Sequence, residues 1–191
     1  NMPTLQNMLD SGIRFNNVWA YPVCTPTRAS ILTGKFGLRT NVQKVGDILS
    51  TGETSLHTYI DENSPHDYAS SLIGKWHLSS DPNHPNELGI DYYAGLLSGA
   101  VQSYTTWNFT ENGTTSVSNE YTTTKFTDLA IDWVQDQDEP WFLWLAYNAP
   151  HTPFHLPPTA LHYQGDLPTD EASIDANPLP YYIAMIEAMR S

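Results

Sequence analysis

The chain has 191 residues, of which 40% are hydrophobic and 12% aromatic, so it is long enough to fill one sizeable core. Its formal net charge of −13, with only 8 Lys and Arg, argues against nucleic acids and anionic membranes as partners. No apolar run is long enough to span a bilayer, the N-terminal residues do not resemble a signal peptide, and a single cysteine can form no internal disulfide.

The first elements predicted in chain order are a short amphipathic helix over residues 3–10 and a strand or extended segment over residues 13–21. Leu5, Met8 and Leu9 have the spacing of one helix face. The extended segment leads directly into the lone cysteine.

The stretch around Cys24 predicts a helix that begins beside this cysteine. Thr25 suits the N-cap and Pro26 the first helical position, while Gly34 suits a left-handed end. Cys24 is therefore expected just outside a helix N-terminus, where free N–H groups and Arg28, one turn further on, favour an anion. A lone cysteine is usually a buried apolar residue, but this electropositive setting favours a reactive one.

The middle of the chain predicts one strand and one hairpin. Residues 68–73 form the strand, which runs into Lys75 and His77. Positions i and i+2 at a strand end point to one face, and open α/β sheets bind ligands at the carboxyl ends of strands. Either side chain alone is more often an ordinary surface residue. Residues 99–120 favour a hairpin that turns at Asn112-Gly113.

The last third of the chain predicts two helices around a buried strand. Residues 121–135 carry a single apolar stripe, as in a core-facing helix. Residues 140–147 are almost all apolar, which is typical of a strand buried on both faces of a parallel sheet, and His151 follows this strand. After a long loop, residues 180–190 have helical spacing. The predicted fold class is α/β, with a mostly parallel central sheet flanked by helices.

Three segments resemble the signature blocks of the formylglycine-dependent sulfatases, in the alkaline phosphatase superfamily. The first, CTPTRASILTG from Cys24, is similar to the family's C-x-P-x-R-x-x-x-L-x-T-G. The second is GKWHL, followed by Ser79 where the family has glycine, and the third is NAPHTPF around His151. The resemblance implies that residues 1–191 are part of one alkaline-phosphatase-like catalytic domain, incomplete because the family's N-terminal paired-Asp strand and C-terminal Asp-Asn segment are missing.

The resemblance also implies a mechanism for hydrolysing sulfate esters. A formylglycine-generating enzyme would convert Cys24 to an aldehyde, whose hydrate attacks the sulfur and then expels sulfate. Arg28 and Lys75 would hold the hydrate, and Lys75 would also reach the sulfate. His77 would take the proton that collapses the intermediate, and His151 would bind a sulfate oxygen or help the leaving alcohol.

A calcium ion is the cofactor that the family adds to this chemistry, since hard oxygen ligands suit it. Of the usual protein ligands, we expect this chain to supply only the modified Cys24. A divalent ion held by one such ligand would bind poorly. We therefore expect the 191-residue chain alone to have little or no sulfatase activity.

Two other functions stay open from the sequence. A phosphonate or phosphate monoester hydrolase of the same superfamily shares the signature, and a non-catalytic remnant is favoured by the missing metal ligands. The expected substrate is a small-molecule or carbohydrate sulfate ester. The resemblance implies a periplasmic or secreted location, and unpaired sheet edges make a homo-oligomer a reasonable expectation.

Overall fold

The computed structural model describes residues 3–190, in which a mixed sheet separates two groups of helices. The strands are β1 (Ala69–Lys75), β2 (Tyr92–Leu96), β3 (Trp107–Glu111), β4 (Thr114–Ser118) and β5 (Trp141–Ala146). The helices are α1 (Pro3–Ser11), α2 (Cys24–Thr33), α3 (Gly37–Thr40), α4 (Leu56–Asn63), α5 (His84–Glu87), α6 (Thr122–Gln135), α7 (Glu171–Ala176) and α8 (Leu179–Ala188), with a 3-10 turn η1 (Thr159–Leu161).

The sheet has the strand order β4-β3-β2-β1-β5. Strand β1 pairs in parallel with both β2 and β5, so that Ile73 lies between Ala94 and Leu145. Strands β2, β3 and β4 pair in antiparallel fashion. The predicted α/β class is confirmed, with the parallel strands at one side of the sheet and the predicted hairpin, β3–β4, at the other.

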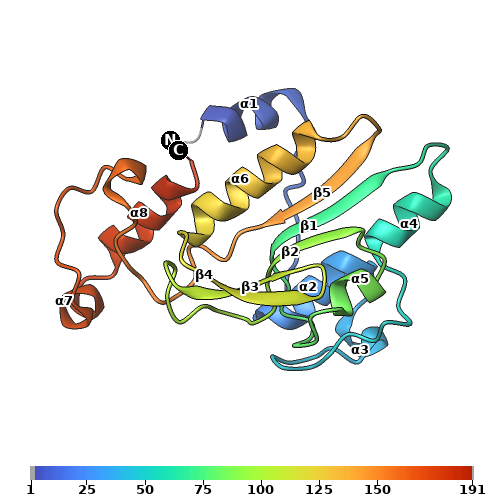
Figure 1. Ribbon diagram of the computed structural model, residues 1–191, viewed down its shortest axis with the longest axis horizontal. Coiled ribbons are helices and arrows are strands. Elements are labelled where there is room, and N and C mark those ends of the chain that lie inside the picture. The colour runs from blue at the N-terminus through green and yellow to red at the C-terminus, as the bar shows by residue number, and fades with distance from the viewer. Residues whose placement is uncertain (1–2, 191) are drawn as a thin grey trace.

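Alternate residues of β1 enter two different cores, because successive strand side chains point to opposite faces. Ile73 packs in the core that contains Phe126 of α6, and Leu72 packs in the core that contains Leu32 of α2. Figure 1 shows α6 along one face of the sheet, while α2, α3 and α5 are grouped apart from it. Helix α2, which begins at Cys24, is thereby held against the carboxyl end of β1.

Two glycines allow the parallel strands to approach closely just before the end of β1. A Cβ on Gly95 would lie 1.7 Å from the carbonyl oxygen of Gly74, and a Cβ on Gly74 would lie 2.1 Å from that of Ala146. Gly74 also has a φ of 117°, which L side chains rarely adopt. The strand that carries Lys75 therefore depends on glycine at these positions.

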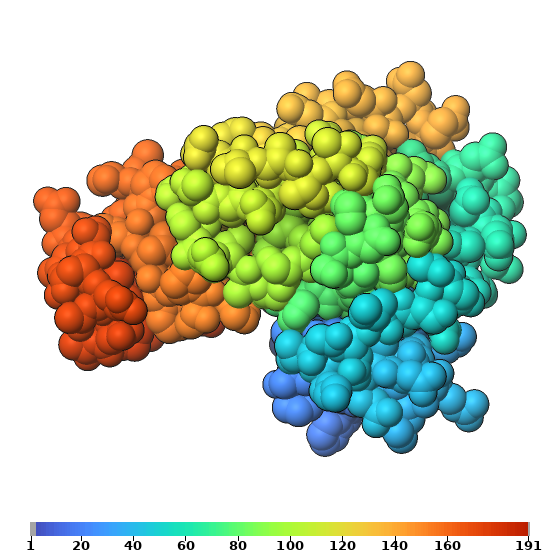
Figure 2. Space-filling view, turned by 60° about the horizontal axis from the view of Figure 1, so that its bottom comes forward, coloured from blue at the N-terminus to red at the C-terminus, as the bar shows by residue number. Residues whose placement is uncertain are grey.

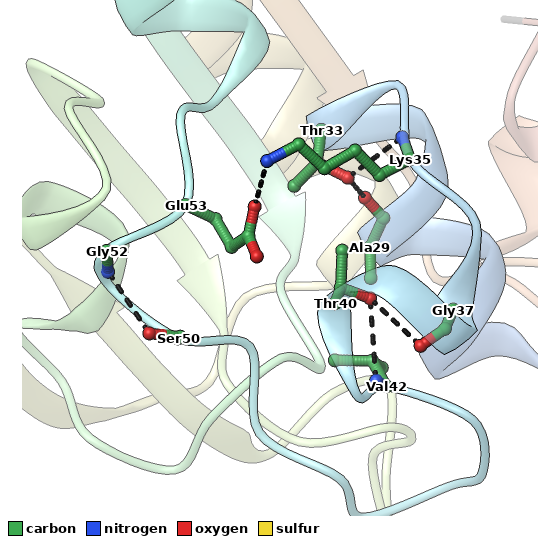
Figure 3. A network of polar contacts seen from close by, with 9 residues as sticks. All are labelled: Ala29, Thr33, Lys35, Gly37, Thr40, Val42, Ser50, Gly52 and Glu53. Carbon is green, nitrogen blue, oxygen red and sulfur yellow. Dashed lines mark hydrogen bonds and ion pairs between the residues drawn. The ribbon is translucent and has the colours of Figure 1, made fainter.

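The far end of α2 is fixed by polar contacts of its own (Figure 3). Gly34 closes the helix in the left-handed conformation that the sequence predicts, with a φ of 66°. The hydroxyl of Thr33 donates to the carbonyl of Ala29 at 2.7 Å, and Lys35 forms an ion pair with Glu53 at 2.6 Å. These contacts tie the helix to the connection that follows it.

Several predicted details are corrected by the structure. Residues 13–21, predicted as a strand or an extended segment, contain no strand, which leaves only the second alternative, and most of their large apolar side chains are exposed. Strand β5 is an edge strand of this sheet, with half-buried rather than fully buried side chains, because among residues 3–190 only β1 pairs with it. Strand β2 was not predicted at all. Helix α7 also interrupts the loop that the sequence predicts before α8.

Among residues 3–190, no helix is both long enough and apolar enough to cross a bilayer. The outer edges of β4 and β5 have no partner strand within the described residues. Homo-oligomerisation through such an edge stays a prediction.

Candidate active site

Cys24 is the first residue of α2, rather than a residue just outside it as the sequence predicts. Val23 is the N-cap, with an extended backbone and no side-chain hydrogen bond to the helix. Thr25, the predicted N-cap, is buried inside the first turn. Cys24 therefore sits directly at the positive end of the helix, where unpaired N–H groups favour an anion.

Two residues from the end of β1 meet Cys24. Lys75 is the last residue of the strand and is 6% exposed. His77 lies beyond the strand with a left-handed φ of 56°, and its Nδ1 atom is 3.2 Å from the Sγ atom of Cys24. Both side chains reach the cysteine, although strand alternation is not the reason, because the strand has ended before His77.

Gly99 lies directly against the His77 ring. A Cβ at this position would lie 2.4 Å from the Cε1 atom and 2.5 Å from the Nε2 atom of the imidazole. The loop after β2 thus accepts the ring edge only because residue 99 lacks a side chain. The hydroxyl of Thr25 lies 3.5 Å from each ring nitrogen.

Arg28 joins α2 to the end of β1. Its Nε atom donates to the carbonyl of Trp76 at 2.6 Å, and a terminal nitrogen donates to the carbonyl of Lys75. The guanidinium carbon also lies 4.6 Å from the centre of the Trp144 ring, within range for a cation–π contact. Arg28 therefore contributes a fixed positive charge near Cys24 while its hydrogen bonds serve the backbone.

His151 reaches the site from the segment after β5. Its Nδ1 atom lies 2.8 Å from the carbonyl oxygen of Thr152, which can only accept, so this nitrogen carries the proton. In a neutral ring Nε2 is then an acceptor. His151, Cys24, Arg28 and Lys75 line one pocket of about 680 Å³. His77 contacts Cys24 but lies outside that lining, and it borders a separate pocket of about 330 Å³ together with Gly99.

Burial and neighbouring charges shift the pKa values of three groups at the site. Burial lowers the pKa of Arg28 to about 10, which leaves it charged at neutral pH. Burial also lowers the pKa of Lys75; Cys24 opposes this shift, and the charge of Arg28 adds to it. The pKa of His77 falls to about 4, first through burial and then through Lys75, Arg28 and His151. His77 is therefore neutral at pH 7, beside two positive charges.

These buried imidazoles make the free energy of unfolding depend on pH. Burial lowers the pKa of His57 and His155, as it does for His77. In the unfolded chain these histidines bind protons near pH 6.5, whereas in the folded chain they do so only at lower pH. Their contribution to the free energy of unfolding is therefore fully present above pH 6.5 and decreases as the pH falls towards 4. We expect the urea midpoint to decrease between pH 6.5 and pH 5, and less so in His57→Gln. A midpoint that stays flat or rises would contradict this.

Three contacts of the site were not predicted from the sequence. Gly99 and Thr25 contact the His77 ring, and the hydroxyl of Tyr104 donates to the carbonyl of His151 at 2.6 Å. Thr25 lies inside the signature block. Tyr104 belongs to a stretch of alternating aromatics that could line a groove or cover the core, but no local pattern places Gly99 or Tyr104 beside a site histidine. Both act through contacts between segments that are far apart in the chain.

The described residues do not form a calcium site. Among residues 3–190 no group of three His, Cys, Asp or Glu side chains converges in a way that could hold a metal. The charged residues that line the Cys24 pocket are Arg28 and Lys75, which would repel a cation. The expectation that this chain supplies only Cys24 as a calcium ligand stays a prediction.

The fold and the clustered signature residues define an α/β protein with a positively charged pocket beside Cys24. The chain matches the family model described as Sulfatase over residues 1–189, and it belongs to that family. It is 31% identical over 183 residues to the uncharacterized sulfatase YdeN of Escherichia coli, a match that covers 79% of this chain and 32% of YdeN. It is 32% identical over 154 residues to an N-acetylglucosamine-6-O-sulfatase of Bacteroides thetaiotaomicron, covering 78% and 26%.

Solved structures agree with this placement. A protein in complex with its substrate D-glucosamine-2-N,6-O-disulfate has a TM-score of 0.70 at 29% identity, covering 84% of this chain and 32% of that one. The structure of Ps i-CgsB with k-i-k-neocarrahexaose has a TM-score of 0.77 at 22% identity, covering 99% and 47%, and shows the shared fold alone. The chain spans about a third or less of the length of the curated relatives that it matches, from 26% to 32% for the first three.

Proposed function

We propose that the chain contains the nucleophile and anion-binding groups of a sulfuric ester hydrolase. The observation that carries this proposal is the contact between Cys24 and His77, 3.2 Å apart, at a helix N-terminus beside the buried Lys75. A nucleophile needs an adjacent base and a setting that stabilises negative charge, and all three are brought together here. Membership of the sulfatase family supports the choice of sulfate as the group transferred.

A formylglycine-generating enzyme is proposed to convert Cys24 to formylglycine. The thiol sulfur then marks the region of the two hydroxyl groups of the hydrate. One hydroxyl would attack the sulfur of the ester and displace the alcohol. His77, whose Nδ1 atom contacts this region, would take the proton of the other hydroxyl, so that the C–O bond to the bound sulfate breaks and the aldehyde forms again. Lys75 and the helix N-terminus hold the negative charge of the sulfate, while Arg28 adds a fixed positive charge.

His151 completes the proposed arrangement on the leaving-group side. Its Nε2 atom is free to bind the sulfate ester or, once protonated, to give its proton to the departing alcohol. Anion binding is expected to raise the proton affinity of His77, because a negative charge in the pocket opposes the effect of Lys75 and Arg28 on that ring.

A carbohydrate sulfate ester is the proposed substrate. The relative from Bacteroides thetaiotaomicron is an N-acetylglucosamine-6-O-sulfatase, and one structural neighbour was solved with D-glucosamine-2-N,6-O-disulfate as its substrate. Both are similar to this chain at about 30% identity. The pocket of about 680 Å³ has room for a sulfated sugar unit.

The residues described hold no carboxylate cluster for calcium, so no step above is assigned to a metal. Low turnover by this chain alone therefore remains part of the proposal. Full sulfatase activity is proposed to require calcium ligands in addition to the residues of this chain, as the family resemblance implies.

Coexpression with a formylglycine-generating enzyme tests the proposal. Mass spectrometry of the Cys24 peptide is expected to show conversion to the aldehyde, and a hydrazide probe is expected to label the chain but not Cys24→Ala. Inorganic sulfate is expected to shift the NMR signals of His77 and His151. Absence of both the aldehyde and the sulfate shift would overturn the hydrolase assignment and leave the non-catalytic alternative.

A turnover assay separates the remaining alternatives. With calcium present, the chain is expected to hydrolyse an aryl sulfate weakly or not at all, and robust activity that a chelator removes would contradict the expected impairment. Tighter binding of phenylphosphonate than of phenyl sulfate would favour the phosphonate or phosphate hydrolase.

A further inference from the structure

Asn148 is a buried polar residue in the wall of the Cys24 pocket. It lies two residues beyond the end of β5, is 3% exposed, and belongs to the lining of the pocket of about 680 Å³ that contains Cys24 and Lys75. Among residues 3–190, neither its Oδ1 atom nor its Nδ2 atom has a hydrogen-bond partner. A buried amide without partners is destabilising, and native proteins retain few of them. An unsatisfied amide in a pocket wall is a candidate contact for the ligand of that pocket.

The backbone around Asn148 is firmly held. Its carbonyl oxygen accepts a hydrogen bond from the N–H of His151 at 2.9 Å. The hydroxyl of Tyr104, which donates to the carbonyl of His151 at 2.6 Å, lies 3.3 Å from the carbonyl oxygen of Asn148. Figure 2 shows the orange residues that follow β5 packed against yellow-green residues from the middle of the chain. The segment is thus anchored, while its side-chain amide has no partner among the described residues.

The other groups of the pocket favour an anion as the partner of this amide. Arg28 and Lys75 are the charged residues of the lining, and both are positive. Two donor groups of Arg28 are already used by the carbonyls of Lys75 and Trp76, so this residue contributes charge more than free donors. The oxygens of a sulfate group only accept hydrogen bonds, and an amide nitrogen carries two donors. Asn148 can therefore supply a directed donor beside the positive charges.

We propose that Asn148 is a substrate-binding residue whose Nδ2 atom donates a hydrogen bond to an oxygen of the bound sulfate group. This inference rests on the proposed sulfatase function and adds a residue to its anion site. Because the amide is shielded from solvent, its side chain turns towards the pocket when the anion enters. The amide is already separated from water in the folded chain, so a hydrogen bond to the anion is formed without a further loss of hydration.

The variant Asn148→Leu tests this role by two effects of opposite sign. Leucine is similar in size to asparagine but carries no polar group, so the unsatisfied amide is removed and the packing is nearly retained. The urea midpoint of the chain is expected to rise, whereas the affinity for inorganic sulfate is expected to fall about tenfold. Both can be measured on the unmodified chain, without the aldehyde and without turnover. A purely structural amide would give the reverse, a lower midpoint with unchanged sulfate affinity.

Thr122 provides a matched control for the removal of an unsatisfied polar group. Its hydroxyl is also buried and without a partner among residues 3–190, but it lies at the start of α6, outside the lining of the Cys24 pocket. Thr122→Val is expected to raise the urea midpoint in the same direction as Asn148→Leu. Its sulfate affinity is expected to equal that of the wild-type chain.

The side-chain amide signal of Asn148 gives a second measurement on the wild-type chain. It is assigned in an NMR spectrum by its absence in Asn148→Leu, and it is expected to shift as sulfate is added. An amide signal that sulfate does not move, an unchanged sulfate affinity in Asn148→Leu, or a lower urea midpoint in that variant would each overturn the inference.

These outcomes are distinct from those that test the hydrolase proposal. If sulfate shifts the signals of His77 and His151 but neither the Asn148 amide nor the affinity of Asn148→Leu responds, the inference fails and the hydrolase proposal stands. If the wild-type chain binds no sulfate, the inference fails, and if Cys24 also forms no aldehyde, the hydrolase proposal fails with it.

Discussion

Replacing Lys75 with Met is expected to weaken the binding of inorganic sulfate at the Cys24 site by about ten- to a hundredfold, the usual cost of losing a charge-assisted hydrogen bond. Lys75 is buried at the end of β1, and Met has a similar volume, so the substitution removes the charge and leaves the packing nearly unchanged. Calorimetric or NMR titration with sulfate measures the effect.

The same variant is expected to raise the pKa of His77 from about 4. Lys75 is the largest cause of that depression after burial, and burial itself is retained in Lys75→Met. The shift is visible in the pH titration of the His77 ring signals. It separates loss of charge from loss of fold, because an unfolded chain would bring all its histidines to their ordinary value near 6.5.

Lys35 provides a matched control for this experiment. It is also a lysine close to α2, but it pairs with Glu53 at the far end of that helix, on the surface. Lys35→Met is expected to leave both the sulfate affinity and the titration of His77 unchanged. Equal sulfate affinity in Lys75→Met and the wild-type chain would remove Lys75 from the anion site.

Replacing Gly95 with Ala is expected to lower the free energy of unfolding by about 3 kcal/mol or more, as severe overpacking does. The added Cβ would lie 1.7 Å from the carbonyl oxygen of Gly74 and 2.6 Å from its carbonyl carbon. These are backbone atoms of the parallel β1–β2 pair, near its carboxyl end, so no side chain can rotate away to relieve the overlap. Chemical denaturation measures the loss, and circular dichroism shows whether the chain still folds.

Gly52→Ala is the control for the cost of replacing a glycine. The nearest atom to its added Cβ is the Ser50 Oγ at 3.5 Å, an ordinary contact, and the backbone there is not left-handed. Its free energy of unfolding is expected to change by less than about 1 kcal/mol. A Gly95→Ala variant as stable as Gly52→Ala would mean that β1 and β2 approach each other less closely than described.

The elements with strong local patterns could be predicted from the sequence. The apolar stripe of residues 121–135 gives α6, the Asn112-Gly113 turn gives the β3–β4 hairpin, and Gly34 gives the left-handed end of α2. In each case the pattern is set by the period of the chain or by the φ values that a residue tolerates. Such preferences act within a few residues, so the sequence carries them directly.

Elements decided by their neighbours were harder to predict. Residues 140–147 have the composition of a strand whose side chains are buried on both faces of a sheet. In the described chain, however, β5 has a partner strand along one edge only, and most of its side chains are half-buried. Strand β2, at Tyr92–Leu96, lacks the alternation of a half-buried strand because its residues are covered on both sides by other elements. Burial and pairing depend on strand order, which the local composition does not specify.

The sequence alone determined the α/β class and the three signature blocks that carry Cys24, Lys75, His77 and His151, and it marked the stretch around Cys24 as the candidate reactive one. The tertiary structure decided how these residues are used. It begins α2 at Cys24 itself, turns His77 into a left-handed conformation against Gly99, and commits Arg28 to the carbonyls at the end of β1. Cys24 and His77 are 53 residues apart, and a contact over that separation is fixed by the packing of a helix on a strand end rather than by any preference of the residues between them.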